Sequence, residues 1–332
     1  MIATPLTEVT RRDVRDGREV VESVHAGHLV VAGADGQVLA RLGDPDATVF
    51  VRSAAKPFQA TACLEVLGEQ ADAVSDAEVA VAWASHRAEP RHLAQVRRLL
   101  ARSLTPAVEL TCTPAVGEAD PGAAPAALSN NCSGKHAMFA LAGRVLGVAG
   151  PDLLNPGQEL QRRVLGVLGE ALGPARAVGT DGCGAPAVAG PLATLAVAYG
   201  RLAVEARWAR VREAGLAHPG LVGGYGRLES ALLAAGVVAK VGAEGVYGVG
   251  WTAPDGTGRG LAVKAADGSV RGAAEAVVAV VEALGVVPTG CWVSPPPLGG
   301  GRPAGVVRCA PPVMRLVATL RREGLTGTGS FG

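Results

Sequence analysis

The first part of the chain alternates apolar and polar residues in a way that indicates β-strands. The segment HLVVAGADGQVLARLG contains two β-rich runs with Asp35-Gly36 between them, which is typical of a hairpin. The following run, ATVFVRS, predicts a strand that ends at Ser53. Residues 56–67 then predict a helix, because Pro57 is tolerated in a first helical turn. Residues 19–52 are therefore expected to be mainly strands.

The middle of the chain changes to a helical pattern. The segment DAEVAVAWAS predicts a helix with Asp76 at its N-cap and Ser85 at its end. The segment EPRHLAQVRRLLARSL is amphipathic, with its basic residues on the outer face. NNCSGKHAMFALAGRVLG predicts a loop that runs into a helix, whereas GTDGCGAP has too many glycines for regular structure.

The last third returns to strands and ends in a helix and loops. EGVYGVGW and GRGLAVKAADG predict antiparallel strands, SVRGAAEAVVAVVEALG predicts a helix, and SPPPLGGGRPAG predicts a loop. This order predicts an α+β fold whose antiparallel sheet is built from both ends of the chain. We expect one domain over residues 1–320, with its sheet in residues 1–57 and 235–315 and its helices in residues 58–234. Residues 321–332 are expected to be a disordered tail.

Composition limits the classes of protein to consider. The chain has 332 residues, of which 48% are hydrophobic and 18% are charged, and its formal net charge is +1. This balance gives no electrostatic reason to expect a nucleic acid or an anionic membrane as a partner. The first residues lack the apolar segment of an export signal, so a cytoplasmic protein is expected. The six cysteines are too sparse for a disulfide scaffold and are expected to be thiols, unless some of them bind metal.

Ser53 and Lys56 form the first candidate for chemistry, in the segment RSAAKPFQ. Their S-x-x-K spacing places both side chains on one face of a helical turn, where an unprotonated lysine could take the serine proton. The same spacing also arises by chance, so this segment alone leaves the question open. Ser85, in SHRAEPRH, is equally open, because a serine that ends an apolar helix can be a plain C-terminal cap.

Two further segments concentrate reactive side chains. NNCSGKH repeats the three-residue spacing in Cys132 and Lys135, and TDGCGAP places Asp181 and Cys183 in a glycine-rich loop. Glycine allows a backbone to approach a ligand closely or to adopt a positive φ. Two cysteines suit zinc, but buried thiols that serve only for packing are an open alternative.

Taken together and in order, VRSAAKPFQ, SHRAEPRH, NNCSGKHAMF and TDGCGAP resemble the Rhizobium etli-type, or thermolabile, L-asparaginases, also called the asparaginase II family. VESVHAGHLVV, HPGLVGGYGRLESAL and GLAVKAADG support the resemblance, which covers residues from about 8 to 290. It implies a homodimer with a serine β-lactamase-like or glutaminase-like fold that hydrolyses L-asparagine to L-aspartate and ammonia. It also implies catalytic roles for Ser53, Lys56, Ser85 and Lys264, and a zinc site made by Cys132, Lys135 and Cys183. Arg52 and Asp181 would lie near the zinc and, with His136, would bind substrate.

The sequence departs from the family pattern at Arg87-Ala88 and in its proline-rich tail, and the resemblance leaves two alternatives. Arg87-Ala88 stands where the family is expected to have a small residue and a glycine, a change that could alter the rim of the pocket. A β-lactamase-like acylase or a glutaminase would use the same S-x-x-K pair, although neither explains NNCSGKH together with DGCGAP. A non-catalytic, zinc-stabilised binding protein is the alternative from another class.

Overall fold

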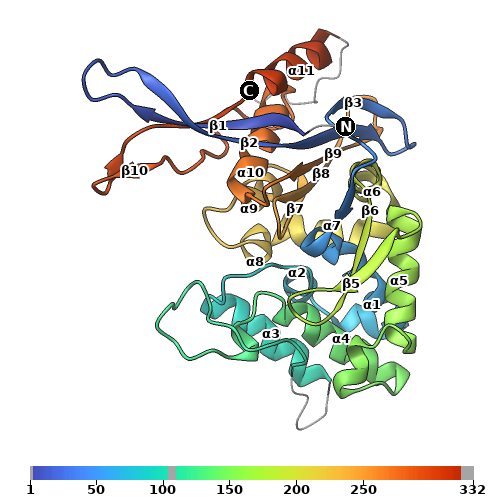
Figure 1. Ribbon diagram of the computed structural model, residues 1–332. Helices are drawn as coiled ribbons and strands as arrows, with labels where there is room; N and C mark the ends of the chain where they lie inside the picture. The colour runs from blue at the N-terminus through green and yellow to red at the C-terminus, as the bar shows by residue number, and fades with distance from the viewer. Residues whose placement is uncertain (1–2, 104–109, 323–332) are drawn as a thin grey trace. The chain divides into compact units, whose positions relative to one another are not determined.

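The computed structural model describes residues 3–103 and 110–322 (Figure 1). Helices alternate with antiparallel strands over these residues, which confirms the predicted α+β class. The strands are β1 (Thr4–Arg12), β2 (Glu19–Gly33), β3 (Val38–Leu42), β4 (Thr48–Phe50), β5 (Ala177–Thr180), β6 (Pro186–Pro191), β7 (Val238–Gly242), β8 (Val246–Thr252), β9 (Gly258–Ala265), β10 (Leu298–Gly299), β11 (Arg302–Pro303) and β12 (Val307–Cys309). The α-helices are α1 (Lys56–Leu67), α2 (Asp76–Ala82), α3 (Pro90–Arg102), α4 (Ser133–Leu146), α5 (Glu159–Leu172), α6 (Leu192–Val204), α7 (Ala209–Ala217), α8 (Pro219–Val222), α9 (Leu228–Ala234), α10 (Val270–Ala283) and α11 (Pro311–Arg322).

The described residues form two compact units, and the first of them contains the larger sheet. This unit comprises residues from 1–49, 191–204 and 239–332. Its strands follow the order β12-β1-β2-β9-β8-β7, with β3 paired to β2. Thr7 pairs with Cys309, and His28 pairs with Lys264. Strands from the two ends of the chain are therefore direct neighbours, as the sequence predicts.

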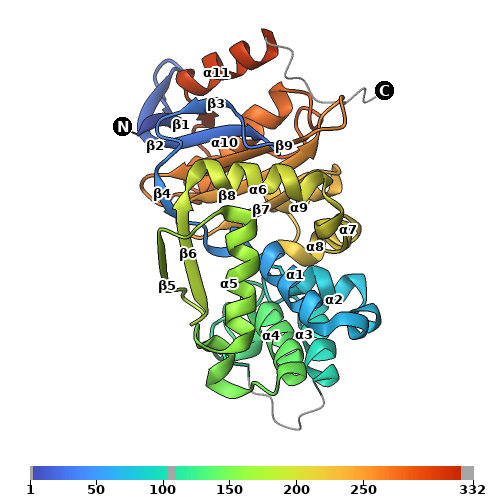
Figure 2. The same ribbon diagram turned by 90° about the vertical axis from the view of Figure 1, so that its right-hand side faces the viewer.

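Helix α6 lies so close to this sheet that only glycine fits at the contact. A Cβ atom added at Gly260 would lie 1.8 Å from the carbonyl oxygen of Ala196, and one added at Gly250 would lie 2.0 Å from that of Tyr199. Figure 2 shows α6 along one side of the sheet and α10 and α11 on the other. Since side chains alternate along a strand, Lys264 lies on the same face of β9 as Gly260, which is the face toward α6.

The second unit comprises residues 50–190 and 205–238 and is mainly helical. Helix α1 begins at Lys56 and ends at Leu67, as predicted, and it packs against α4, α5 and α7. Almost all of its side chains are buried, and the ring of Phe58 meets that of Trp208 edge to face at 5.2 Å. Lys56 is thus the first residue of a buried helix.

Three boundaries differ from the sequence-based expectations. The N-cap of α2 is Ser75 rather than Asp76, because the Ser75 hydroxyl accepts from Glu78 N–H while the Glu78 carboxylate accepts from Ser75 N–H. Helix α2 ends at Ala82, so Ser85 lies in the loop beyond it and is not the helix end. In the segment GTDGCGAP, Gly179 and Thr180 end β5 and Pro186 begins β6, so only residues 181–185 form the irregular turn of an antiparallel hairpin.

Two differences concern the C-terminal part. The expected proline-glycine loop contains the short hairpin of β10 and β11, in which Gly299 pairs with Arg302. Helix α11 continues to Arg322, so the first two residues of the predicted tail are helical. The remainder of that tail, residues 323–332, lies outside the described residues.

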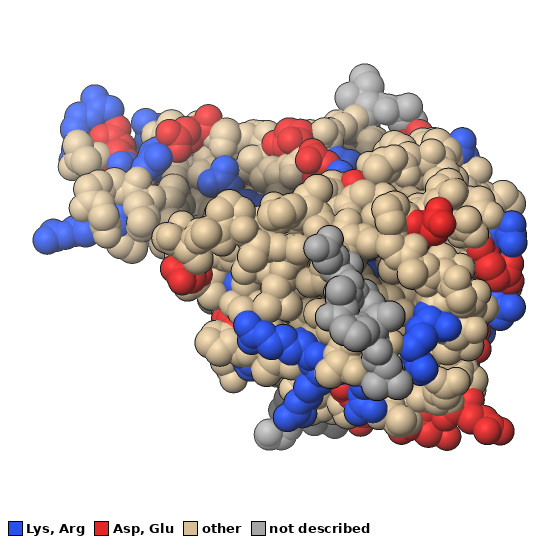
Figure 3. Space-filling model, turned by 90° about the horizontal axis from the view of Figure 1, so that it is seen from below, with Lys and Arg blue, Asp and Glu red and all other residues tan. Residues whose placement is uncertain are grey.

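The described surface carries charges of both signs. Figure 3 shows acidic and basic side chains scattered among other residues on the face seen from below. Over residues 3–103 and 110–322, no single helix is long and apolar enough to cross a membrane. One pair, Ser133–Leu146 with Gly150–Leu172, passes by length and composition alone and is bent by 107°.

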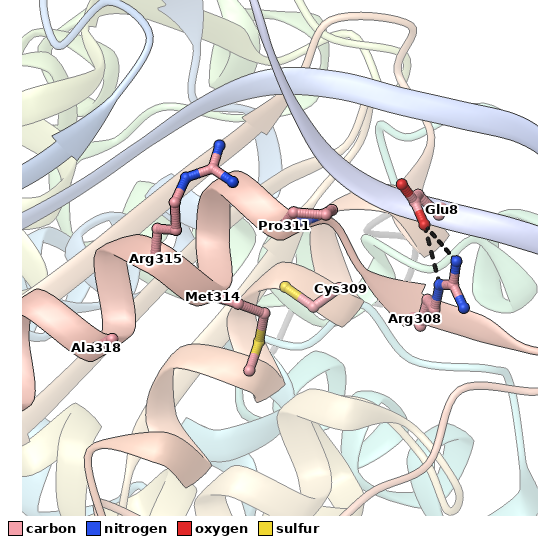
Figure 4. Close-up of a pocket in the computed structure, with 7 residues that line it drawn as sticks. All are labelled: Glu8, Arg308, Cys309, Pro311, Met314, Arg315 and Ala318. Carbon is pink, nitrogen blue, oxygen red and sulfur yellow. Dashed lines mark hydrogen bonds and ion pairs between the residues drawn. The ribbon is translucent and has the colours of Figure 1, made fainter.

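A cavity of about 430 Å³ lies in the first unit (Figure 4). Met314 and Cys309 line its middle, and the Glu8–Arg308 ion pair lies at one end. It is lined by Glu8, Arg308, Cys309, Pro311, Met314, Arg315 and Ala318. None of these residues is one of the predicted site residues.

Candidate active site

The side chain of Lys56 is directed at the loop that carries Ser85. The residue is 1% exposed, and its Nζ donates to Ala84 O at 2.5 Å, to Ser85 Oγ at 3.2 Å and to Asn131 O at 3.5 Å. Two of these acceptors are main-chain carbonyls from two separate segments. Because carbonyls accept from both sides of the amine, they hold it beside the Ser85 hydroxyl.

The two segments around Lys56 meet because α2 and α4 are in backbone contact. A Cβ atom added at Gly134, in α4, would lie 2.0 Å from the carbonyl oxygen of Val81, in α2. The glycine of NNCSGKH therefore allows the start of α4 to lie against the end of α2. Ser85 follows that end, and its N–H donates to Val222 O at 2.9 Å.

Ser53 lies in the 3-10 turn η1 (Arg52–Ala55), directly before α1. It is half-buried, and its carbonyl oxygen accepts from Lys56 N–H. Arg52 has a φ of 50°, a left-handed conformation that is uncommon for a residue with a side chain. Its guanidinium pairs with Asp181 Oδ1 at 2.9 Å. The turn that carries Ser53 is thus joined to the β5–β6 turn.

Cys132, Lys135 and Cys183 come together, as the sequence predicts. All three are buried, and Lys135 Nζ donates to Cys183 Sγ at 3.1 Å. Cys132 is the residue before α4, and its thiol is in hydrogen-bond contact with Cys183 and also with Asn131 Oδ1 at 3.2 Å. Since Lys56 also contacts Cys132, this cluster adjoins the Lys56–Ser85 pair.

Cys132, Cys183 and Lys135 shift one another's pKa values. The hydrogen bond from Cys183 and the nearby lysines outweigh burial and hold the pKa of Cys132 well below its usual value. The same hydrogen bond and burial raise the pKa of the Cys183 thiol. Burial alone would lower the pKa of Lys135, but Cys132, Cys183 and Asp181 raise it. The contacts among these three side chains thus lower the pKa of Cys132 and raise the pKa values of Cys183 and Lys135.

Asp181 and His136 lie at the border of this cluster. Burial would raise the pKa of Asp181, but the charges of Lys135 and Arg52 outweigh it and lower the pKa. His136 is 1% exposed, and its Nδ1 lies 2.7 Å from Thr111 Oγ1. Burial, followed by the charges of Lys135 and Lys56, holds its pKa well below the usual value, so the ring is neutral. Its Nε2 is buried without a hydrogen-bond partner among the described residues.

Two neighbours of the cluster were missed in the sequence. Cys112 is buried, and burial with the nearby Cys132 charge raises the pKa of its thiol to about 11. Asn131 supplies both an amide oxygen to Cys132 and a carbonyl to Lys56. Cys112 is remote in sequence from the other cysteines and has no motif around it, whereas the Asn-Asn pair of NNCSGKH was a signal that went unused.

Lys264 belongs to the first unit and is described with it. Its Nζ donates to Glu244 O at 2.7 Å and also to Ala265 O. Burial lowers its pKa, although the charges of Glu244 and Asp267 act in the opposite direction. Its partnership with Ser53, Lys56 and Ser85 stays a prediction.

The Arg87-Ala88 departure lies two residues beyond Ser85. Ala88 has a φ of 61°, a conformation that glycine adopts without strain. Arg87 lies 3.3 Å from a Glu118 carboxylate oxygen and donates to Tyr225 O at 3.2 Å. The glycine expected from the family is therefore the residue that this backbone favours.

The donor set around Cys132 fits zinc only if lysine takes part. Residues 3–103 and 110–322 contain no group of three or more His, Cys, Asp and Glu side chains arranged for a metal. The two thiols and the Lys135 side chain do converge, and the two thiols suit zinc, but Lys135 could be the third donor only after losing its proton. The Nε2 atom of the buried His136 has no hydrogen-bond partner among the described residues, so it could still bind a polar group.

No curated protein matches the chain. Residues 12–306 match the family described as L-asparaginase II, a range that includes all the candidate residues and most of the chain. The chain therefore belongs to the L-asparaginase II family, and it is an amidohydrolase of the asparaginase type that acts on a small molecule.

Proposed function

We propose that the protein is an L-asparaginase that hydrolyses L-asparagine to L-aspartate and ammonia through an ester on Ser53. The observation that carries the proposal is the contact of the buried Lys56 amine with the Ser85 hydroxyl. A serine–lysine pair is a means of activating a hydroxyl for attack on an amide. The family match supplies the substrate class.

In the proposed reaction, Ser53 Oγ attacks the side-chain amide carbon of asparagine, and its proton passes to Lys56. Collapse of the tetrahedral intermediate breaks the C–N bond, and the nitrogen leaves as ammonia with a proton delivered through Ser85. Water then hydrolyses the Ser53 ester and releases aspartate. The net change is addition of one water to one amide, so no further reactant is required.

The contacts of Lys56 support its role as the proton acceptor. A neutral amine has two N–H groups and one lone pair. If the amine is neutral and the carbonyls of Ala84 and Asn131 accept its two N–H groups, its lone pair would accept from the Ser85 hydroxyl, the reverse of the donation described above. Ser85 would then relay protons between Lys56 and the reacting groups.

Lys264 is proposed as the second lysine of the mechanism. Burial lowers the pKa of Lys264, which favours a lysine that can exchange a proton with the reacting groups. The assignment follows the analogy with serine β-lactamases, which carry a K-T-G motif in addition to S-x-x-K. We accordingly propose a β-lactamase-like fold, assembled as a homodimer.

Cys132, Lys135 and Cys183 are proposed to hold zinc. When bound, zinc would supply a positive charge that orders the two loops or attracts the α-carboxylate of the substrate. Asp181 is well suited to bind the substrate α-ammonium, because its pKa is held low and its carboxylate stays charged. Arg52 orients Asp181, and the neutral His136 offers an unpartnered ring nitrogen in the same region.

The experiment is ammonia release from L-asparagine and L-glutamine, measured for the wild type beside Ser53→Ala. Turnover of asparagine that is lost in Ser53→Ala supports the proposal. Preferred turnover of glutamine, or of a chromogenic cephalosporin in a parallel assay, would favour the glutaminase or acylase alternative. A folded, zinc-binding protein that acts on none of the three would favour the non-catalytic alternative.

A further inference from the structure

We propose that His86 is a positioning residue, which fastens the Ser85 loop to the NNCSGKH segment and so holds Lys56 beside Ser85. The inference rests on the proposed function, since it assigns a role in that same reaction. His86 directly follows Ser85, and neither the nucleophile nor the proton transfers involve it. Its contacts are nevertheless made with the two segments that surround the Lys56 amine.

The hydrogen bonds of the His86 ring define its tautomer. His86 is 2% exposed, and its Nδ1 accepts from Ala88 N–H at 3.1 Å. Because Nδ1 is an acceptor, the proton of the neutral ring is on Nε2, which donates to Ser133 Oγ at 2.8 Å. The Ser133 hydroxyl donates in turn to Leu128 O at 2.9 Å. The ring therefore spans from its own loop to the first residue of α4.

The main chain of His86 makes a second link between the same segments. Its N–H donates to Asn131 O at 3.3 Å. Asn131 O and Ala84 O are also the two carbonyls that accept from Lys56 Nζ. Residues on both sides of Lys56 are thus tied together by His86, and a shift of either segment would move a carbonyl away from the amine.

A second histidine restricts the ring further. His92 stacks on His86 with ring centroids 5.4 Å apart and an interplanar angle of 17°. Its Nδ1 accepts from Glu89 N–H at 3.2 Å, and its Nε2 lies 3.0 Å from Gly220 O. Burial, followed by the charges of His92 and Lys56, lowers the pKa of His86 to about 3. The ring is therefore uncharged at neutral pH, which suits a fixed donor rather than a proton carrier.

The test compares His86→Ala, His86→Gln and Ser133→Ala by steady-state kinetics with L-asparagine. The glutamine amide nitrogen can reach the place of Nε2, so His86→Gln keeps a donor for Ser133, whereas His86→Ala removes it. We expect kcat to fall about 10- to 100-fold in His86→Ala with KM changed less than about threefold, and most of kcat to return in His86→Gln. Ser133→Ala should also lower kcat. When Ser133→Ala is present, adding His86→Gln should give the same kcat as adding His86→Ala, because the glutamine then has no serine hydroxyl to donate to.

A second readout separates positioning from a general loss of stability. Gln161→Leu, in α5, removes a buried hydrogen bond to Leu153 O, which does not involve these segments, and serves as the control. It should lower Tm without lowering kcat. Hydrogen exchange at the amides of Ser85 and His86 should accelerate in His86→Ala and Ser133→Ala but not in this control.

The outcomes distinguish this inference from the proposed function. Wild-type protein that releases no ammonia from asparagine would refute the proposed function. If the wild type is active, two results would refute the role of His86 alone. The first is an unchanged kcat in Ser133→Ala. The second is an equal loss of kcat in His86→Ala and His86→Gln, in the wild-type background as well as in the Ser133→Ala background. If His86→Ala does not fold, Ser133→Ala and His86→Gln still test the role of His86, because each of them changes only one side of the contact between His86 and Ser133.

Discussion

The amine of Lys56 and the hydroxyl of Ser85 lie 3.2 Å apart, although 29 positions separate them in the chain. The S-x-x-K motif alone would pair Lys56 with Ser53, three residues before it. The buried amine instead extends across to the loop after α2, where the carbonyls of Ala84 and Asn131 also accept from it. The Lys56 amine is therefore held beside Ser85, and its proton transfer with Ser53 stays a prediction.

Replacement of Lys56 by arginine should remove activity while keeping the positive charge. The guanidinium stays protonated at any pH used for assays, so it cannot accept the serine proton. We expect kcat with asparagine to fall roughly 10²- to 10⁴-fold in Lys56→Arg and in Ser85→Ala. The exposed Arg162→Lys serves as the control and should be unaffected. Full activity of a folded Lys56→Arg protein would exclude Lys56 as the base.

The rate should rise with pH if Lys264 acts as its neutral form. Burial lowers the pKa of Lys264 from 10.5, so deprotonation begins at a lower pH than in a free lysine. We expect kcat/KM to increase with pH and to level off below pH 10.5, whereas Lys264→Arg should be slow throughout. A pH profile of wild type and variant measures this. A wild-type profile that falls over the same range would contradict the proposal.

Zinc should depend on the two thiols of the cluster. Protein purified anaerobically is expected to contain about one zinc per chain by elemental analysis, and Cys132→Ser and Cys183→Ser should lose most of it. Cys309→Ala, which changes a cysteine in the first unit, is the matched control and should keep the metal. Zinc-free wild type with undiminished turnover would leave the cysteines as packing residues.

Ala88→Gly should stabilise the protein. With a φ of 61°, Ala88 occupies a conformation that an alanine adopts only with strain, and glycine relieves it. The gain in the free energy of unfolding should be about 1 kcal/mol, measurable by urea denaturation. Ala101→Gly, in the exposed part of α3, should have the opposite sign because that residue is helical. A loss of stability in Ala88→Gly would show that the turn requires the methyl group.

Acid should destabilise the fold through the stacked histidines. Burial lowers the pKa of His86 to about 3 and also lowers that of His92. Their pKa values in the unfolded chain are near 6.5, so below pH 6.5 the unfolded state binds more protons and stability falls as pH falls. The free energy of unfolding should drop by up to about 1.4 kcal/mol per pH unit for each ring. Urea denaturation at several pH values between 7.5 and 4.5 should show a shallower slope in His92→Gln.

The sequence predicted the elements better than the contacts of the site. Hydrophobic alternation and Asp-Gly turns located the hairpins, and Pro57 marked the start of α1, because these signals are local. The N-cap was assigned to Asp76 rather than Ser75 because both residues are good caps, and only the reciprocal bonds with Glu78 distinguish them. Ser85 was placed at the end of that helix because the apolar run in the sequence continues beyond Ala82, where the helix ends.

The convergence of the four motifs could be predicted only through the family resemblance. Nothing local in NNCSGKH indicates that Gly134 brings α4 against Val81, or that Asn131 reaches Lys56. Cys112 lies near Cys132 solely through the tertiary structure. Such contacts depend on the packing of separate helices, which periodicity does not specify.

The pairing of β1 with β12 has a consequence for biosynthesis. Leu6 O accepts from the Cys309 thiol, 303 positions later in the chain. At about 5–20 residues per second, the ribosome needs roughly 15–60 s to make the segment between them. During that interval β1 and β2 must remain without β12 and β9, while the residues of the second unit have already been made. The nascent chain thus exposes the edges of β1 and β2 that later pair with β12 and β9 for most of its synthesis, and a chaperone that shields such edges would be of greatest use at this stage.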